Sequence, residues 1–144
     1  MIEFFIPGEP PTVTAQQKGQ NRRTGKYYKP PELRDAEQKY MAYAYQARPA
    51  EPFTGSVKLM VIFGFLATGK HKPGEPKITK PDTDNMVKLL KDCLTKCSFW
   101  KDDAQVAHET VVKVWTNSPG IVVMAAPWEN EEGGIGNDVS EVQT

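Results

Sequence analysis

The chain has 144 residues, of which 39% are hydrophobic and 25% are charged, and its formal net charge is zero. This length suits one domain with a hydrophobic core and is too short for two comfortable domains. No apolar run is long enough to cross a bilayer, and the first residues lack the pattern of a signal peptide. We therefore expect a cytoplasmic protein with no membrane partner.

The zero net charge hides an asymmetry between the body of the chain and its C-terminal end. Residues 127–144 carry five acidic side chains and no Lys or Arg, which leaves 18 basic and 13 acidic side chains in residues 1–126, a net charge of +5. We expect residues 1–126 to form the folded domain and residues 127–144 to be a disordered acidic tail. A moderately basic body fits a nucleic-acid partner without establishing one.

The first half of the chain predicts two strands separated by a long loop and a helix. Residues 2–6 form a short apolar strand, and residues 8–31 form a polar segment rich in Lys, Arg and Tyr. Pro30-Pro31 starts a helix with an apolar face, which ends before Pro49. Residues 55–66 are apolar at both alternating sets of positions, which favours a central strand covered on both sides.

The second half predicts a helix followed by two strands. Residues 84–97 have apolar side chains at helical spacing, including Cys93 and Cys97, which we interpret as reduced core residues. Strands are predicted over residues 105–116 and 120–126. The order β-α-β-α-β-β indicates an α+β fold close to α/β, with helices packed on one small mixed sheet.

Four carboxylates and a lysine lie at the two ends of the second predicted helix. Asp82, Asp84 and Lys88 stand at its start, and Asp102 and Asp103 follow its end. Each has a plain alternative role: the first two acids as a helix cap, Lys88 as the ion-pair partner of Asp84, and the second pair as a polar turn. Taken together, they suggest a shared cation, since clustered carboxylates repel one another. An all-oxygen ligand set favours Mg²⁺ or Mn²⁺.

These acids share one metal only if the chain doubles back. A helix of about 14 residues spans roughly 20 Å, so Asp103 approaches Asp84 only if Phe99-Trp100 leads into a strand that returns alongside the helix. The sequence alone does not establish this return. If it occurs, the carboxylates hold a metal that polarises a phosphodiester and lowers the pKa of a water molecule, with Lys88 stabilising the phosphate.

This pattern resembles the RusA-type Holliday junction resolvases of bacteria and their phages. The matching residues are Asp82-Thr83-Asp84-Asn85, Lys88, Leu94-Thr95-Lys96, Phe99-Trp100-Lys101-Asp102-Asp103-Ala104-Gln105-Val106 and Val111-Val112-Lys113. The resemblance is close for about 35 residues. It includes the spacing between the acidic groups, which is the same feature that suggested a metal site.

The resemblance implies a role for each acid. Asp82, Asp84 and Asp103 correspond to the metal ligands, Lys88 corresponds to the lysine important for cleavage, and Asp102 is an additional position with an open role. It further implies a homodimer that cuts four-way DNA junctions with Mg²⁺ or Mn²⁺ and without an organic cofactor. Two sites related by a two-fold axis suit paired nicks, because a junction has strands of like polarity related by the same symmetry.

Basic residues in the two long loops are candidates for DNA contact: Lys18, Arg22, Arg23, Lys26, Lys77 and Lys80. Tyr27 and Tyr28 stand among them and could pack on sugars or unstacked bases. The alternative is a solubilising loop whose tyrosines pack on the domain.

The leading hypothesis is therefore a Mg²⁺-dependent endodeoxyribonuclease that resolves Holliday junctions by paired symmetric nicks. A second hypothesis is a less selective nuclease that acts on flaps or forks. The non-enzymatic alternative is a DNA-binding module whose acids serve only as caps and turns, and this alternative leaves the combined acidic pattern unexplained.

Overall fold

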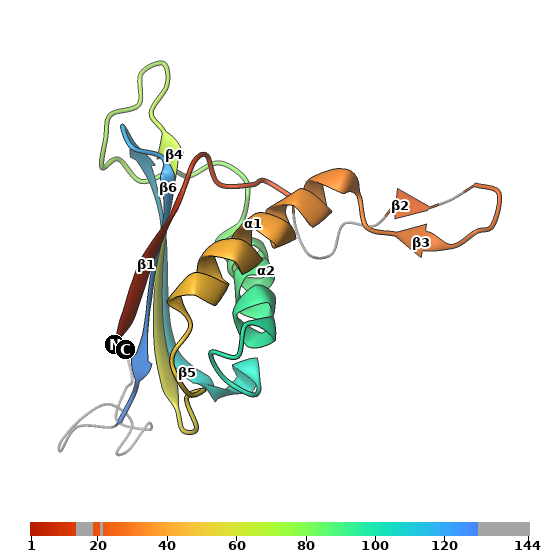
Figure 1. Cartoon of the computed structure of the whole chain (residues 1–144). Coiled ribbons are helices and arrows are strands. Elements are labelled where there is room, and N and C mark those ends of the chain that lie inside the picture. The colour runs from red at the N-terminus through yellow and green to blue at the C-terminus, as the bar shows by residue number, and fades with distance from the viewer. Residues whose placement is uncertain (14–18, 21, 130–144) are drawn as a thin grey trace, which may run out of the picture.

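The computed structural model describes residues 1–13, 19–20 and 22–129, and two helices pack on one face of a four-stranded sheet (Figure 1). The elements in chain order are β1 (Ile2–Pro7), β2 (Gly19–Gln20), β3 (Tyr27–Tyr28), α1 (Pro31–Ala47), β4 (Val57–Leu66), α2 (Thr83–Lys96), the 3₁₀-helix η1 (Asp103–Gln105), β5 (Val106–Thr116) and β6 (Gly120–Pro127). The predicted α+β class and the main order of elements are confirmed. The β2–β3 pair and η1 are additions that the sequence did not predict.

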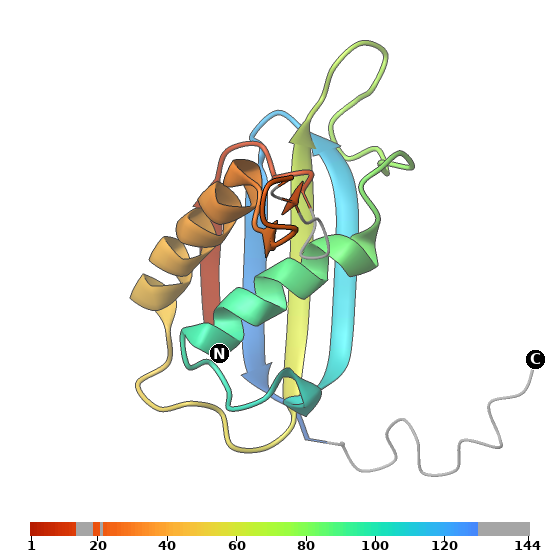
Figure 2. The same ribbon diagram turned by 90° about the vertical axis from the view of Figure 1, so that its right-hand side faces the viewer.

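The strands of the sheet are ordered β1-β6-β4-β5 (Figure 2). The β4–β5 pair is parallel, and the β1–β6 and β4–β6 pairs are antiparallel. A chain that leaves one strand and returns to a parallel neighbour needs a crossover connection, and α2 is that crossover between β4 and β5. The sheet is therefore mixed, as predicted, with β1 and β5 at its edges.

The core lies between the sheet and the two helices. Helix α1 has Pro31 in its first turn and ends before Pro49, as predicted, and its buried residues are Leu33, Ala36, Tyr40 and Ala44. Helix α2 buries Met86, Val87, Leu89, Leu90, Cys93 and Leu94. Both cysteines are free thiols inside this core, which confirms their interpretation. These residues form one hydrophobic cluster with the inner face of the sheet.

The expectation that β4 is covered on both sides was wrong. Both helices lie on the same side of the sheet, as the edge-on view of Figure 1 shows. On the opposite side of β4, Met60 and Ile62 are only half-buried and Leu66 is 45% exposed. A strand with two apolar faces thus lies centrally in a two-layer domain with one open sheet face.

The C-terminal strand continues to Pro127, and the next residue is also held by the domain. The Trp128 N–H donates to the Ser56 carbonyl at 2.8 Å, and its ring lies 5.1 Å from that of His108 between centroids. Residues 130–144, most of the predicted tail, lie outside the described residues. Within the described part of the chain, no helix is long and apolar enough to span a membrane.

Candidate metal centre and nucleic-acid interface

Two exposed carboxylates stand at the N-terminus of α2. Asp82 occupies the cap position, but its side chain makes no capping hydrogen bond, and Asp84 follows in the first turn. Neither carboxylate has a hydrogen bond or ion pair within the described residues. Capping alone therefore does not account for Asp82, and both oxygen pairs are open to an external cation.

Lys88 lies one helical turn beyond Asp84 on the same exposed side of α2. The plain alternative was an ion pair between these two residues, and the described residues contain no such pair. The ammonium group of Lys88 is thus available to a negatively charged ligand near the two carboxylates.

The loop that enters α2 is fixed to the sheet by Lys113 of β5 and by Lys77 of the loop itself. Lys113 of β5 donates through Nζ to the Thr79 carbonyl at 2.6 Å and to the Pro81 carbonyl at 2.7 Å. Lys77 lies beside it, with Nζ 4.5 Å from the ring centroid of Trp115. These contacts position the backbone that immediately precedes Asp82.

Lys77 was predicted to contact DNA, and the structure places its side chain in the interior. The residue is only 9% exposed, and burial, followed by the neighbouring charge of Lys113, lowers the pKa of Lys77. Its ammonium group also donates to the Thr79 hydroxyl. Lys80, three residues further on, is exposed beside Asp82 and remains the candidate for DNA contact in this loop.

The two acids of η1 have different surroundings. Asp102 accepts a hydrogen bond from the Ala104 N–H at 2.9 Å, and the side chain of Gln105 accepts one from the Asp102 N–H at 3.1 Å. Asp102 therefore forms a capping box, which is the plain structural role considered for it. Asp103 has no such partner in the described residues and is half-buried.

Asp103 faces a polar hollow beside the last turns of α2. The hollow is about 410 Å³ and is lined by Lys29, Glu37, Asp92, Cys93, Thr95, Lys96, Lys101, Asp102 and Asp103. Its position shows that Asp103 lies at the C-terminal end of α2, whereas Asp82 and Asp84 lie at the N-terminal end. Fourteen residues of helix separate the two ends, which is about 20 Å.

A single chain does not bring the three predicted ligands together. The strand that follows α2 does return alongside it, since Lys91 of α2 pairs with Glu109 of β5 at 2.8 Å. However, Asp103 precedes that strand and stays at its start. Accordingly, no group of three or more His, Cys, Asp or Glu side chains in the described ranges could hold a metal ion.

The aromatic link before η1 belongs to the core. Phe99 and Trp100 are buried, and the Trp100 indole N–H donates to the Thr95 hydroxyl at 2.8 Å. His108, near the start of β5, packs edge-on against the ring of Trp128. The buried rings of Phe99 and Trp100 anchor the turn that precedes Asp102 and Asp103.

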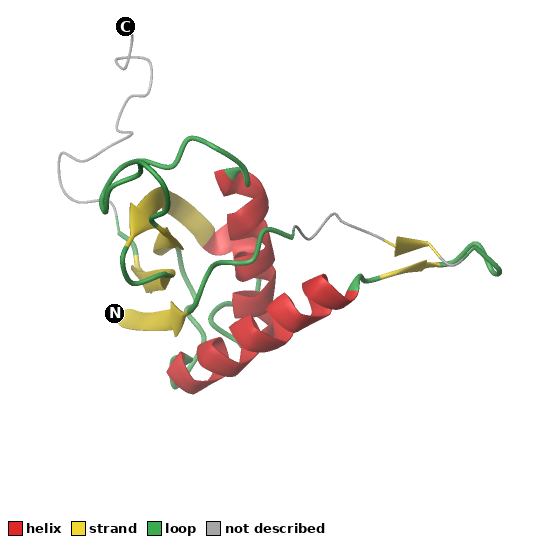
Figure 3. Cartoon of the chain, turned by 90° about the horizontal axis from the view of Figure 1, so that it is seen from above, coloured by secondary structure: helices red, strands yellow, loops and turns green. Residues whose placement is uncertain are grey.

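A two-stranded arm of β2 and β3 projects from the domain beside the start of α1 (Figures 1 and 3). Arg22, Arg23 and Lys26 are exposed on it, and Tyr27 and Tyr28 are 69% and 48% exposed. The tyrosine rings therefore remain largely accessible to a ligand. Lys18 lies outside the described residues.

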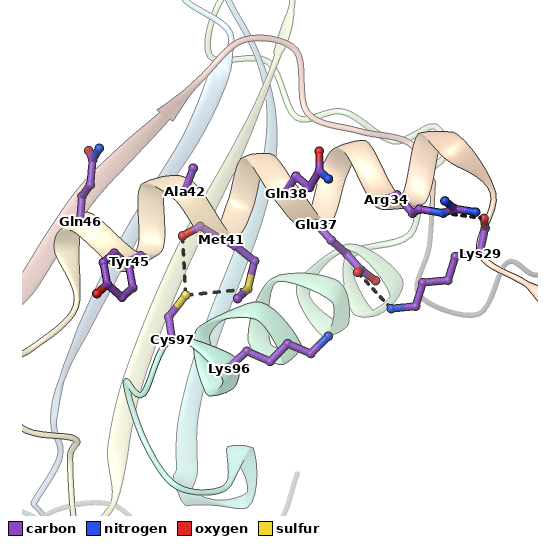
Figure 4. Close-up of a pocket in the computed structure, with 10 residues that line it drawn as sticks. All are labelled: Lys29, Arg34, Glu37, Gln38, Met41, Ala42, Tyr45, Gln46, Lys96 and Cys97. Carbon is purple, nitrogen blue, oxygen red and sulfur yellow. Dashed lines mark hydrogen bonds and ion pairs between the residues drawn. The ribbon is translucent and has the colours of Figure 1, made fainter.

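A second hollow runs along the outer side of α1 (Figure 4). Its walls include Met41, Ala42 and Tyr45, and it is closed at one end by the Lys29–Glu37 ion pair at 3.1 Å. Cys97 forms part of its floor and donates through Sγ to the Met41 carbonyl. This hollow contains one carboxylate, that of Glu37, and it is already paired with Lys29. The hollow is therefore a poor metal site.

Comparison with known proteins identifies the family of this chain. The chain matches the family described as Endodeoxyribonuclease RusA over residues 7–125. The chain belongs to the RusA family. The match spans both helices and strands β2 to β5, with β6 as far as Ala125, and it includes only Pro7 of β1. The resemblance that the acidic motif indicated therefore extends over most of the fold.

Individual relatives agree with the RusA family assignment. The chain is 30% identical over 115 residues to a crossover junction endodeoxyribonuclease rusA of Lactococcus phage r1t, covering 78% of this chain and 88% of that one. It is also 30% identical over 135 residues to the uncharacterized protein YqaN of Bacillus subtilis, covering 85% of this chain and 94% of the relative. The Crossover junction endodeoxyribonuclease RusA of Escherichia coli K12 is 49% identical over 39 residues, 27% of this chain and 32% of that protein.

Proposed function

We propose that this RusA-family chain is a divalent-metal-dependent endodeoxyribonuclease that resolves four-way DNA junctions by paired symmetric nicks. The observation that carries the proposal is a pair of exposed carboxylates, Asp82 and Asp84, with the ammonium group of Lys88 one turn away, and none of the three has a side-chain partner among the described residues. Relatives named as crossover junction endodeoxyribonucleases support this choice of substrate. A DNA substrate also implies the cytoplasmic location expected from the sequence.

Asp82 and Asp84 fit Mg²⁺ or Mn²⁺ as two of the ligands. Both are carboxylates, both are solvent-accessible, and neither accepts a hydrogen bond in the part of the chain that the structure describes. When bound, such an ion polarises the scissile phosphodiester and favours attack by water. Lys88 would bind a phosphate oxygen, and Lys80 would hold the adjoining backbone of the DNA.

The third ligand, Asp103, would come from a second copy of the chain. Within one chain it lies at the opposite end of α2, about 20 Å from Asp84. In a two-fold dimer, each chain can lend its Asp103 to the Asp82–Asp84 pair of the other, which forms two equivalent sites. This proposal accounts for the separation of the acids within one chain, and it requires the homodimer that the family resemblance implied.

The basic arm would contact the DNA outside the reacting strand. Arg22, Arg23 and Lys26 are exposed on it and can neutralise phosphates, and Tyr27 and Tyr28 present accessible rings to sugars or unstacked bases. Lys18 belongs to the same proposal by its place in the sequence. The arm would thus add affinity for an opened branch point.

The test is cleavage of a synthetic four-way junction with and without Mg²⁺ by the folded protein. We expect paired nicks only with the metal, and Asp82→Asn should reduce the rate by about 10³-fold or more while junction binding persists. Asp35→Asn, an exposed acid of α1, is the matched control and should cut at the wild-type rate. An intact junction under all metal conditions would contradict the proposal.

The accessible tyrosines of the arm favour one second candidate, a less selective nuclease that acts on flaps or forks. Stacking on unpaired bases does not require a four-way branch. Rates on junction, flap, fork and linear duplex distinguish the two candidates, because a resolvase should cut the junction at least tenfold faster than the others. If Asp82→Asn leaves every property unchanged, the non-enzymatic DNA-binding module is favoured instead.

A further inference from the structure

Two short segments carry all of the charge imbalance of the chain. Residues 10–31 have five basic side chains and no acidic one, and residues 129–144 have five acidic side chains and no basic one. The other residues carry 13 basic and 13 acidic side chains, so their net charge is zero. The chain therefore joins a basic segment and an equally acidic segment to a neutral body, and the two segments attract each other.

The cations that are candidates for DNA contact lie on the surface of the domain. Arg22, Arg23 and Lys26 are exposed on the β2–β3 arm, and Lys80 and Lys88 are exposed beside the candidate metal pair. We call these five side chains the DNA-contact cations. A polyanion can neutralise them whether its charges are phosphates or carboxylates.

The acidic segment leaves the domain beside η1. Strand β6 is followed by Trp128, whose N–H donates to the Ser56 carbonyl at 2.8 Å. The side-chain amide of Gln105, the last residue of η1, donates to the carbonyl of the preceding residue, Gly55, at 3.0 Å. Two neighbouring residues thus hold the end of β6 and the end of η1, so the acidic segment begins close to Asp103.

This position brings the acidic segment to a second copy of the chain, and in this respect the inference rests on the proposed function. There, Asp103 of one copy joins the Asp82–Asp84 pair of the other. Because the segment begins next to η1, it begins near the same pair and near the lysines beside it. The 15 residues after Glu129 can span at most about 50 Å, which exceeds the length of about 20 Å of α2. The segment is therefore long enough to extend well beyond the metal pair.

We propose that residues 130–144 bind the DNA-contact cations of the second copy in place of DNA and so weaken the binding of linear duplex. The carboxylates of Glu131, Glu132, Asp138 and Glu141 replace phosphates in these contacts. A four-way junction presents several duplex arms to a dimer and displaces the segment, whereas a linear duplex makes fewer contacts and competes poorly. The segment thus raises the selectivity of the dimer for branched DNA.

Tethering makes weak binding by carboxylates effective. A short tether holds its end at an effective concentration of about 1 mM. Non-specific electrostatic complexes have dissociation constants of about 0.1 mM or lower at physiological salt. A segment that binds with about 0.1 mM therefore occupies its site in about nine of ten copies, and the apparent affinity for linear duplex falls about tenfold.

Two exposed lysines near the start of the segment offer a rival location. Lys58 lies in register with Ala126 of β6, and Lys101 precedes Asp103 by two residues. Binding to these lysines alone would keep the segment at its own end of the sheet, away from the DNA-contact cations. The affinity for DNA would then not depend on the segment.

The first test measures the binding of a linear duplex by fluorescence anisotropy, without metal. Truncation after Glu129 keeps every described residue of the domain and should strengthen binding about tenfold at low salt. The full-length variant Glu131→Gln/Glu132→Gln/Asp138→Asn/Glu141→Gln should bind as tightly as the truncated protein. An unchanged affinity in either protein would overturn the proposal.

A matched control removes the apolar side chains of the same segment and keeps its charge. Ile135→Ser/Val139→Ser/Val142→Ser should bind linear duplex like the wild type. If this variant gains as much affinity as the truncated protein, apolar contacts hold the segment and the charge-based proposal is wrong.

Removal of the arm cations separates direct occupancy from general charge repulsion. In the background Arg22→Gln/Arg23→Gln/Lys26→Gln, truncation should strengthen duplex binding less than about threefold, because the segment and the DNA no longer share those contacts. An undiminished gain of about tenfold would mean that the segment repels DNA without occupying the cations, which contradicts the proposal.

Carbodiimide coupling locates the segment directly, because it joins a carboxylate to an amine in contact. Mass spectrometry of the full-length protein should find acids of residues 130–144 coupled to Lys26, Lys80 or Lys88, and excess linear duplex should suppress these products. In a mixture of isotope-labelled and unlabelled chains, coupled peptides should combine the two. Coupling confined to Lys58 or Lys101, or confined to one chain, would overturn the proposal.

These measurements need no metal and no cleavage, so the two proposals can fail separately. If truncation leaves duplex binding unchanged but the wild-type protein cuts junctions, the segment is not a competitor and the nuclease stands. If truncation strengthens duplex binding but no DNA is cut under any metal condition, the competitor stands and the proposed function is wrong.

Discussion

Lys113 holds the two carbonyl groups that precede the candidate ligand Asp82. Its ammonium group reaches the Thr79 and Pro81 carbonyls at 2.6 and 2.7 Å, so the loop is tied to β5 just where it turns into α2. Lys77 lies beside this contact, with its ammonium group 5.0 Å from the ring centroid of Phe65 and 4.5 Å from that of Trp115. Lys113 is thus a positioning residue for the candidate metal centre.

Replacing Lys113 by methionine should reduce cleavage more than it reduces stability. The two hydrogen bonds contribute about 1 kcal/mol each to the free energy of unfolding. A shift of Asp82 by about 1 Å should lower the cleavage rate about 10²-fold and raise the Mg²⁺ concentration needed for half-maximal rate. Urea unfolding and rates over a Mg²⁺ series measure the two effects.

Lys113→Arg is the control, because arginine keeps the charge and can donate to both carbonyls. It should recover most of the rate and the ordinary Mg²⁺ requirement. If Lys113→Met leaves the Mg²⁺ requirement unchanged and lowers only stability, Lys113 acts on the fold alone.

At the scale of elements, the short helix η1 is the joint between α2 and β5. Gln105 holds it to the neighbouring chain: its amide donates to the Phe53 carbonyl at 2.8 Å and to the Gly55 carbonyl at 3.0 Å. Its side-chain oxygen also accepts hydrogen bonds from the backbone N–H groups of Lys101 and Asp102. One side chain therefore fixes both the turn and the position of Asp103.

Gln105→Ala should lower the free energy of unfolding by about 2–4 kcal/mol, since it removes four hydrogen bonds at a partly buried joint. Urea unfolding followed by tryptophan fluorescence measures the change, because Trp100 lies in the same turn. Asp102→Asn keeps a capping oxygen and should cost less than about 1 kcal/mol. Equal losses in the two variants would contradict this assignment of roles.

At the scale of the whole molecule, the separation of Asp103 from the other acids requires a dimer if all three bind one metal. A mixture of two inactive proteins tests this directly. In a mixed dimer of Asp82→Asn and Asp103→Asn chains, one site carries both substitutions and the other carries neither. A site formed within one chain would leave every site in the mixture defective.

Co-folding the Asp82→Asn and Asp103→Asn proteins in equal amounts should therefore restore cleavage. About half of the dimers are then mixed, and each has one intact site, so about a quarter of the wild-type sites return. Nicking of the four-way junction measures the recovery, and each protein alone provides the baseline. Activity at the baseline in the mixture would show that Asp103 does not act across the dimer.

Local patterns in the sequence were enough to predict the main elements and the candidate acids. The apolar periodicity that places α1, α2 and β4 depends only on neighbours along the chain. The acidic motif likewise has fixed spacing within one stretch, and its resemblance to the RusA family is confirmed over residues 7–125. The sequence therefore determined the fold class, the family and the residues to consider.

Only the tertiary structure decided where those residues lie relative to one another. It placed Asp103 at the far end of α2, gave Asp102 a capping role, buried Lys77 and left one face of the sheet open. The capping box of Asp102 is local, but the other three outcomes depend on contacts between segments that are distant in the sequence, such as Lys113 with Pro81 and Lys77 with Trp115. Local spacing carries no information on such contacts, because the packing of helices against the sheet sets them.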